Sequence, residues 1–199
     1  MAPDCNPEPT DPRIRRTRQL LQQALGKLLA AKEFDKISIQ EIADAATVNR
    51  VTFYDHYPDK FALLDGMVSA RFHDLLTQRG ITFNGTCASA LSGMVHAIID
   101  FLTLTPGVAC RAPQHQMEPH LESAIIGVVR GMLLHGLSQH PSPDGPSPEL
   151  TAAALSWAMY GAVKEWLRTP DRSSGNEIVP TVVQLLFPLM HPQPMPVHP

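Results

Sequence analysis

The chain has 199 residues, of which 44% are hydrophobic and 18% charged, and these proportions are typical of a globular protein rather than a disordered one. No run of 18 apolar residues occurs, so the sequence predicts no membrane-spanning helix and no membrane partner. The net charge of −3 gives no overall attraction to nucleic acid, so such a function would depend on how the charges are distributed.

Residues 1–12 are rich in proline and acidic side chains and lack the basic and apolar regions of a signal peptide, so we expect a disordered lead-in. The three cysteines are scattered and form neither a disulfide framework nor a CxxC motif, which favours a cytoplasmic protein. His115 and His120, like His135 and His140, are spaced by five, which points them to different faces of a helix. We therefore expect no metal site and no cofactor.

A first amphipathic helix is predicted from Arg13 to about Ala31. Its apolar residues recur at the spacing of one helix face: Ile14, Leu21, Ala24, Leu25 and Leu28. Its first turns carry Arg13, Arg15, Arg16 and Arg18, which suit either a solvated face or contacts to phosphate. Beyond residue 60, by contrast, carboxylates outnumber lysines and arginines.

Two short helices with a tight turn between them follow. An S-x-x-E capping box at Ser38 predicts a helix that ends near Ala45, and Asn49 is suited to cap a further helix that ends near His56. The residues available to fix the angle between the two helices are Ile42, Ala43, Val48 and Phe53. This is the spacing of a helix-turn-helix, and the alternative is a structural αα-hairpin without a DNA role.

The rest of the chain continues in helical patterns. Asp59 is suited to cap a fourth helix that reaches about Gln78. Further helices are predicted over residues 91–102, 119–138, 149–168 and 176–190, separated by segments rich in glycine and proline. Gly127 and Gly131 lie inside one of them, where they indicate either close packing against a neighbouring helix or mere tolerance. Strand-type alternation is scarce, so the predicted fold class is all-α with about nine helices.

If the second short helix enters the major groove, its first residues reach the base edges. Arg50 can then pair with guanine, Thr52 can offer its hydroxyl or methyl group, and Val51 can contact a thymine methyl. Residues with phenolic, imidazole or ammonium groups follow at positions suited to phosphates: Tyr54, His56, Tyr57 and Lys60.

The stretch from Arg13 to Leu64 resembles the N-terminal domain of the TetR family of repressors, through EIADAATV and above all VTFYDHYPDKFALL. AVKEWL, at residues 162–167, is also similar to the family's dimerisation region. The resemblance implies a sequence-specific regulator of double-stranded operator DNA that acts as a homodimer, its last two helices forming a four-helix bundle with those of the partner subunit. The implied DNA contacts are Ser38, Thr47, Asn49, Arg50, Val51, Thr52, Tyr54, His56, Tyr57 and Lys60.

The resemblance also implies a domain order: a helix-turn-helix domain at 13–60, a regulatory and dimerisation domain at 61–190, and a disordered tail at 191–199. Two residues depart from the family pattern. Thr47 replaces the glycine usual in the turn, and a non-glycine residue at positive φ costs about 1 kcal/mol. Val51 stands where the family often has a small residue, which leaves the operator sequence open.

An unidentified small-molecule inducer is implied for the helical core. Candidate ligand-binding residues are Phe72, Met94, Ile98, Phe101, Met117 and Trp157, although ordinary core packing is the alternative. Candidate residues of the subunit interface are Ala154, Ala158, Gly161, Val182 and Leu186, with the same alternative.

Two other classes of function are open at this point. The first is an enzyme, but the sequence has no GxGxxG, P-loop, HExxH or GxSxG motif, so we expect no enzymatic activity. The second is an all-α interaction module without a DNA role, against which the recognition-helix pattern speaks.

Overall fold

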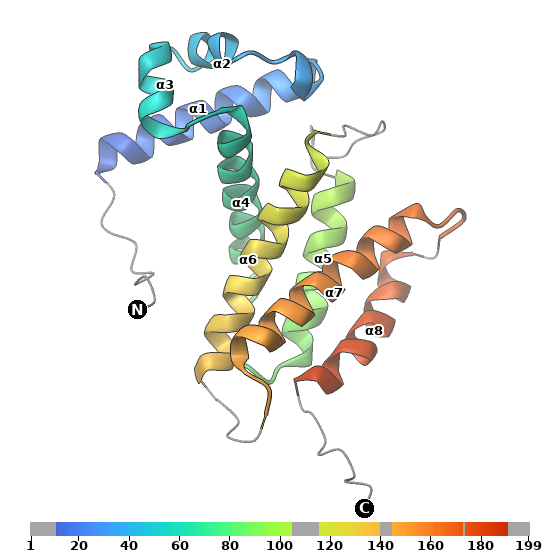
Figure 1. Ribbon diagram of the computed structural model, residues 1–199. Coiled ribbons are helices and arrows are strands. Elements are labelled where there is room, and N and C mark those ends of the chain that lie inside the picture. Colours follow the sequence, from blue (N-terminus) through green and yellow to red (C-terminus); the bar gives the residue numbers. More distant parts are fainter. Residues whose placement is uncertain (1–10, 105–115, 140–144, 173, 191–199) are drawn as a thin grey trace, which may run out of the picture. The chain divides into compact units, whose positions relative to one another are not determined.

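The computed structural model describes residues 11–104, 116–139, 145–172 and 174–190, and all regular structure within these ranges is helical (Figure 1). The α-helices are α1 (Pro12–Ala31), α2 (Ile39–Ala45), α3 (Arg50–His56), α4 (Lys60–Gln78), α5 (Ala88–Leu104), α6 (Glu118–Gln139), α7 (Pro148–Arg168) and α8 (Gly175–Leu186). Two 3-10 helices, η1 (Phe34–Lys36) and η2 (Phe187–Leu189), complete the described elements. The all-α prediction is confirmed, with eight α-helices in place of about nine.

The predicted helix starts depend on local capping chemistry, and the structure shows that chemistry. Asn49 Oδ1 accepts from the Val51 amide at 2.9 Å, and Asp59 Oδ1 accepts from two amides at the start of α4. The start of α1 differs slightly, because Asp11 caps it and Pro12 occupies its first turn. The lead-in was predicted over residues 1–12, but Asp11 and Pro12 belong to the start of α1. Residues 1–10 of the lead-in and the predicted tail at residues 191–199 lie outside the described residues.

The described residues fall into two compact units. The first comprises residues 11–67 and 116–120, and the second comprises residues 68–104 and 121–190 with the gaps given above. The division falls inside α4, after Met67. A functional boundary at residue 60 stays a prediction.

In the first unit, α2 and α3 both pack on α1 (Figure 1). The fully buried side chains come from all three helices and from η1, and they include Leu21, Leu25, Phe34, Ile42 and Phe53. The sequence pattern placed Ile14 on the buried side of α1, but this residue is 39% exposed. The buried residues of α1 begin only at Leu21. Burial of these large apolar groups is the main force that holds the short helices in place.

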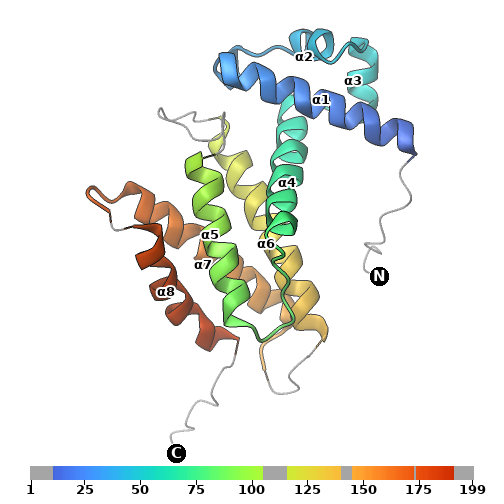
Figure 2. The ribbon, with the colours of Figure 1, turned by 180° about the vertical axis from the view of Figure 1, so that it is seen from behind.

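In the second unit, α5 packs against α7 and α8, and α7 packs against α8 (Figure 2). Phe72 of α4 and Phe101 of α5 meet edge to face at 5.2 Å between ring centroids. Gly136 of α6 is required by a close approach, since a Cβ atom there would lie 2.4 Å from the carbonyl oxygen of Phe83. Among the described helices, α6 alone has the length and apolar composition of a membrane span, properties that buried helices of soluble proteins share.

Candidate nucleic-acid interface

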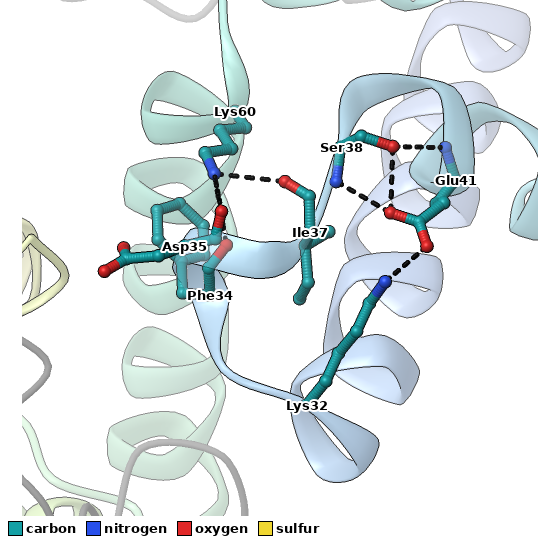
Figure 3. Close-up of polar contacts among 7 residues, drawn as sticks. All are labelled: Lys32, Phe34, Asp35, Ile37, Ser38, Glu41 and Lys60. Atoms are coloured by element: carbon teal, nitrogen blue, oxygen red, sulfur yellow. Dashed lines mark hydrogen bonds and ion pairs between the residues drawn. The ribbon is translucent and has the colours of Figure 1, made fainter.

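The helix-turn-helix is built as its sequence predicts. The hydroxyl of Ser38 accepts from the Glu41 amide while the Glu41 carboxylate accepts from the Ser38 amide, so both halves of the capping box are present (Figure 3). Ile42, Ala43 and Phe53 are buried between the helices. The short turn leads straight into the cap of α3, which fixes the angle of that helix.

Thr47 occupies the left-handed backbone region, with φ of 57°. Its amide donates to the Asp44 carbonyl at 3.0 Å, and the next amide, that of Val48, donates to the Ala43 carbonyl at 3.0 Å. The turn therefore keeps the conformation that glycine adopts without a steric penalty, although a β-branched residue stands there. The backbone carries this strain rather than adopting a different turn.

The outer face of α3 presents a small cluster of groups to solvent. Val51 is 67% exposed and Tyr54 is 45% exposed. The guanidinium of Arg50 donates to the Tyr54 hydroxyl at 3.2 Å and lies 5.7 Å from the centre of that ring. Arg50, Val51 and Tyr54 therefore form one exposed patch, the α3 patch, at the start of the helix.

Two other predicted contact residues on α3 are only partly exposed. Thr52 is half-buried, and so is His56, whose Nδ1 is buried without a hydrogen-bond partner among the described residues. An N–H at this position would be an unsatisfied buried donor, so we assign the ring proton of His56 to Nε2. That nitrogen is a donor of the kind that a phosphate accepts.

Tyr57 has a structural role that the sequence-based prediction of a phosphate contact missed. It is 8% exposed, and its hydroxyl accepts a hydrogen bond from Nε2 of Gln22 at 3.1 Å. Arg18 lies over the ring, 5.8 Å from its centre, and burial raises the pKa of the Tyr57 hydroxyl. The ring thus joins the end of α3 to α1.

Lys60 is likewise placed differently from its prediction. Its ammonium donates to the carbonyl oxygens of Phe34 at 3.1 Å, Asp35 at 3.3 Å and Ile37 at 3.0 Å, as Figure 3 shows in part. It also lies 4.7 Å from the centre of the Phe34 ring. All three donors of the ammonium are directed at the protein's own backbone, so we name this arrangement the Lys60 clamp and give it a structural role in place of the predicted phosphate contact.

Glu41 forms a second polar connection that the sequence did not reveal. Besides closing the capping box, its carboxylate pairs with the ammonium of Lys32, which follows the end of α1 (Figure 3). The hydrogen bond from Lys32 and those from Ser38 lower the pKa of Glu41 to about 2. Because Ser38 is occupied by this carboxylate, its predicted DNA contact would have to compete with the capping box.

The ligand residues predicted from sequence are mostly core. Phe72, Met94, Ile98, Phe101 and Met117 are at most 2% exposed, whereas Trp157 is 57% exposed on the surface of α7. The groove that the second unit does contain is lined by other residues of α4 and α6. Large apolar side chains at helical spacing filled the core, which is the alternative that the sequence left open.

The predicted interface residues divide between surface and interior. Ala154 and Gly161 of α7 are exposed, and Ala158 is half-buried. Val182 and Leu186 of α8, at 2% and 8% exposure, are buried within the subunit and do not belong to a free face. The exposed apolar residues near them are Leu185, at 70%, and Leu189, at 43%. Val182 and Leu186 lie on the apolar side of this amphipathic helix, which packs within the subunit, so their place in a subunit interface remains a prediction.

Comparison with known proteins gives this site a context. Residues 21–67 match the sequence model described as bacterial regulatory proteins, tetR family. A segment of 59 residues is 42% identical to an uncharacterised HTH-type transcriptional regulator, YxbF, of Bacillus subtilis (strain 168). This segment is 29% of the present chain and only 16% of that relative.

Solved structures extend the similarity over most of the fold. A TetR transcriptional regulator from Streptococcus agalactiae 2603V is 22% identical, with a TM-score of 0.52 over 87% of this chain and 95% of that one. RolR, solved with the ligand resorcinol, is 17% identical, with a TM-score of 0.54 over 92% of this chain and 97% of that one. At these identities the likeness concerns the fold.

Proposed function

We propose that this chain is a TetR-type, ligand-responsive repressor of a specific operator, because residues 21–67 match the sequence model of that family and a 59-residue segment is 42% identical to an HTH-type transcriptional regulator. DNA binding and transcription regulation follow from the family, as does a non-enzymatic role. The finer part of the proposal is that a small apolar molecule, bound in the C-terminal helical unit, releases the DNA. A cytoplasmic location fits this role.

The α3 patch is the observation that carries the proposal. Arg50, Val51 and Tyr54 of α3 are exposed, whereas Phe53 of the same helix is buried in the unit. An α-helix inserted in the major groove reads bases with residues near its N-terminus. The guanidinium of Arg50 matches the two acceptors of guanine, and the branched side chain of Val51 matches a thymine methyl.

A homodimer would supply a second helix-turn-helix domain. Two half-sites about one helical turn apart, roughly 34 to 36 Å, require two linked recognition helices. The exposed apolar side chains of Trp157 on α7 and Leu185 on α8 support a subunit interface formed by these two helices.

For a ligand to release the DNA, it must bind more tightly to the dimer when the two helix-turn-helix domains are placed so that they no longer fit the operator. A 100-fold loss of DNA affinity corresponds to about 2.7 kcal/mol of coupling, and DNA must then weaken ligand binding by the same factor. The fold likeness to RolR, which was solved with resorcinol, supports a small-molecule ligand of this general kind.

The test is a fluorescence-anisotropy titration of the full chain against duplexes from the DNA that flanks its coding region, at several salt concentrations. We expect specific binding that weakens steeply with salt. Arg50→Ala should lose the preference for the operator over unrelated DNA, by about 1–3 kcal/mol. The control is Arg168→Ala, which removes the same charge from an exposed position at the end of α7. An unchanged preference in Arg50→Ala would contradict the base-reading role, and salt-independent binding would contradict the proposal.

A further inference from the structure

A groove of about 590 Å³ lies on the second unit between α4 and α6. We propose that it binds an apolar small molecule, of the size of two or three aromatic rings, that carries one oxygen group able to accept hydrogen bonds. None of the residues predicted from sequence to bind a ligand lines it. The inference deepens the proposed function by locating the ligand, and it rests on that function only for the effect of the ligand on DNA.

Two glycines create the groove on the α6 side. Gly127 and Gly131 stand one helical turn apart, both are exposed, and both line the groove. A Cβ atom added at either position would meet nothing within 4 Å. The close helix packing considered for these glycines is therefore absent at both positions. Each glycine costs the helix about 1 kcal/mol relative to alanine, and the fold gives no steric reason for it.

The size and the floor of the groove match a small organic molecule. Ligand sites commonly occupy about 300 to 1,000 Å³ and are lined mainly by apolar groups with a few polar ones. Here Ala70 of α4 and Val128 and Met132 of α6 supply the apolar surface. Methionine adapts to irregular apolar shapes, which suits a flat molecule laid along the groove.

The polar groups of the groove define the second feature of the ligand. His135 belongs to the lining, and its Nε2 lies 3.0 Å from the amide nitrogen of Gln139. An amide nitrogen only donates, so Nε2 accepts and the ring proton is on Nδ1. His135 thus offers an N–H donor, and His73 and Ser69 of α4 add further hydrogen-bonding groups. A ligand with a sulfonate, carboxylate or phenolic oxygen satisfies such donors.

Two dyes that differ in one group test both features. 8-Anilinonaphthalene-1-sulfonate has the aromatic rings and an anionic oxygen group, and N-phenyl-1-naphthylamine has the same rings without it. Fluorescence titration of the full chain should give saturable binding of both dyes. Gly131→Leu fills the groove, and we expect it to raise the Kd of both dyes by about tenfold. Ser138→Leu places the same side chain at an exposed position of α6 outside the lining and should leave both values within twofold.

A second variant separates the donor from the apolar floor. His135→Ala should raise the Kd of the sulfonate dye by about tenfold, because a hydrogen bond to a charged group is lost, and that of the neutral dye by less than twofold. This result would not follow from general damage to the fold. Circular dichroism of each variant should match the wild type, and His135→Ala keeps the test informative if Gly131→Leu does not fold.

Three results would overturn the inference. Equal loss of dye binding in Ser138→Leu and Gly131→Leu would show that the dyes bind elsewhere. Equal effects of His135→Ala on both dyes would remove the acceptor-bearing class of ligand. A change of oligomeric mass in Gly131→Leu, by light scattering, without a change in dye affinity would assign the groove to a second copy of the chain. Dye binding that behaves as expected in a protein without DNA affinity would leave the groove standing and contradict the repressor.

Discussion

Thr47 holds its backbone where glycine would be unstrained, and the turn keeps its hydrogen bonds all the same. Thr47→Gly should therefore stabilise the native state despite the greater freedom of glycine in the unfolded chain. We expect a gain of about 0.5–1 kcal/mol in the free energy of unfolding, measured by urea denaturation. A loss of stability would mean that the threonine side chain makes a compensating contact. DNA affinity in the same variant reports whether Thr47 touches the operator.

Lys60 yields a prediction opposite to a phosphate contact. Lys60→Met keeps the apolar stem and removes the ammonium donor from three carbonyl oxygens, of which that of Phe34 keeps the Ile37 amide as a donor. The free energy of unfolding should fall by about 2 kcal/mol. The matched control is Lys36→Met. The Lys36 side chain is 70% exposed and its ammonium pairs with Glu33, so this change should alter stability by less than about 0.5 kcal/mol. If Lys60→Met is as stable as wild type but binds DNA less well, the clamp is wrong and the original interpretation is right.

The partners of Lys60 could not be predicted from the sequence, because an ammonium donates to phosphate oxygens and to carbonyl oxygens in the same way. Which of the two it meets depends on where η1 lies, and no local pattern gives that position. Tyr57 illustrates the same point, since its partner Gln22 is 35 residues away. Val51 was easier, because it lies on the opposite side of the helix from Phe53, so a helix that buries Phe53 must expose it.

At the scale of the element, two glycines of α6 should respond in opposite directions to the same substitution. Gly131→Ala should stabilise the protein by up to about 1 kcal/mol, because the methyl group enters open space. Gly136→Ala should destabilise it by about 2 kcal/mol or more, because the Cβ atom would lie 2.4 Å from a backbone oxygen. Thermal or chemical denaturation of the pair measures both, and equal effects would mean that α6 shifts to accommodate either residue.

The capping box of α2 predicts a dependence of stability on pH. The pKa of Glu41 is lowered from 4.5 to about 2, so its carboxylate stabilises the native state above pH 4.5, and this contribution is lost as the pH falls toward 2. Denaturation between pH 6 and pH 2 should show a smaller loss in Glu41→Gln than in the wild type. Parallel curves for wild type and Glu41→Gln would contradict the lowered pKa.

Helix starts were predictable from the sequence because caps are local: Ser38, Asn49 and Asp59 each bond to amides within three residues. The faces of the helices were less predictable. The apolar side of α8 holds Val182 and Leu186, and whether that side faces the subunit's own core or a partner subunit depends on the position of α5. For Gly127 and Gly131 the sequence showed a cost but not the open space that accompanies it.

At the scale of the whole molecule, the proposed dimer depends on exposed apolar side chains of α7 and α8. Trp157→Glu combined with Leu185→Glu should convert the protein to a monomer in sedimentation experiments. Operator affinity should then fall by at least about tenfold, because the two half-sites are no longer bound by linked heads. Leu104→Glu, at a 71% exposed position of α5, is the matched control. A doubly substituted protein that remains dimeric would place the interface elsewhere.

The fold class and the match of the N-terminal module to the TetR family were within reach of the sequence, because the helical periodicity and the recognition-helix pattern are both local signals. The ligand groove was not, because it depends on how α4 and α6 lie beside each other and on side chains that are absent. Large apolar residues predicted the core correctly and, for the same reason, misled the search for a pocket.

The Lys60 clamp also restricts the number of residues between η1 and α4. It ties residue 60 to a carbonyl 23 residues earlier, and the helix-turn-helix is the segment between these two points. An inserted or deleted residue in the turn would either rotate α3 by about 100° relative to α2 or break the hydrogen bonds of Lys60 to the carbonyl oxygens. Recognition can therefore diverge by substitution on α3, whereas the distance along the chain from η1 to α4 has to stay constant.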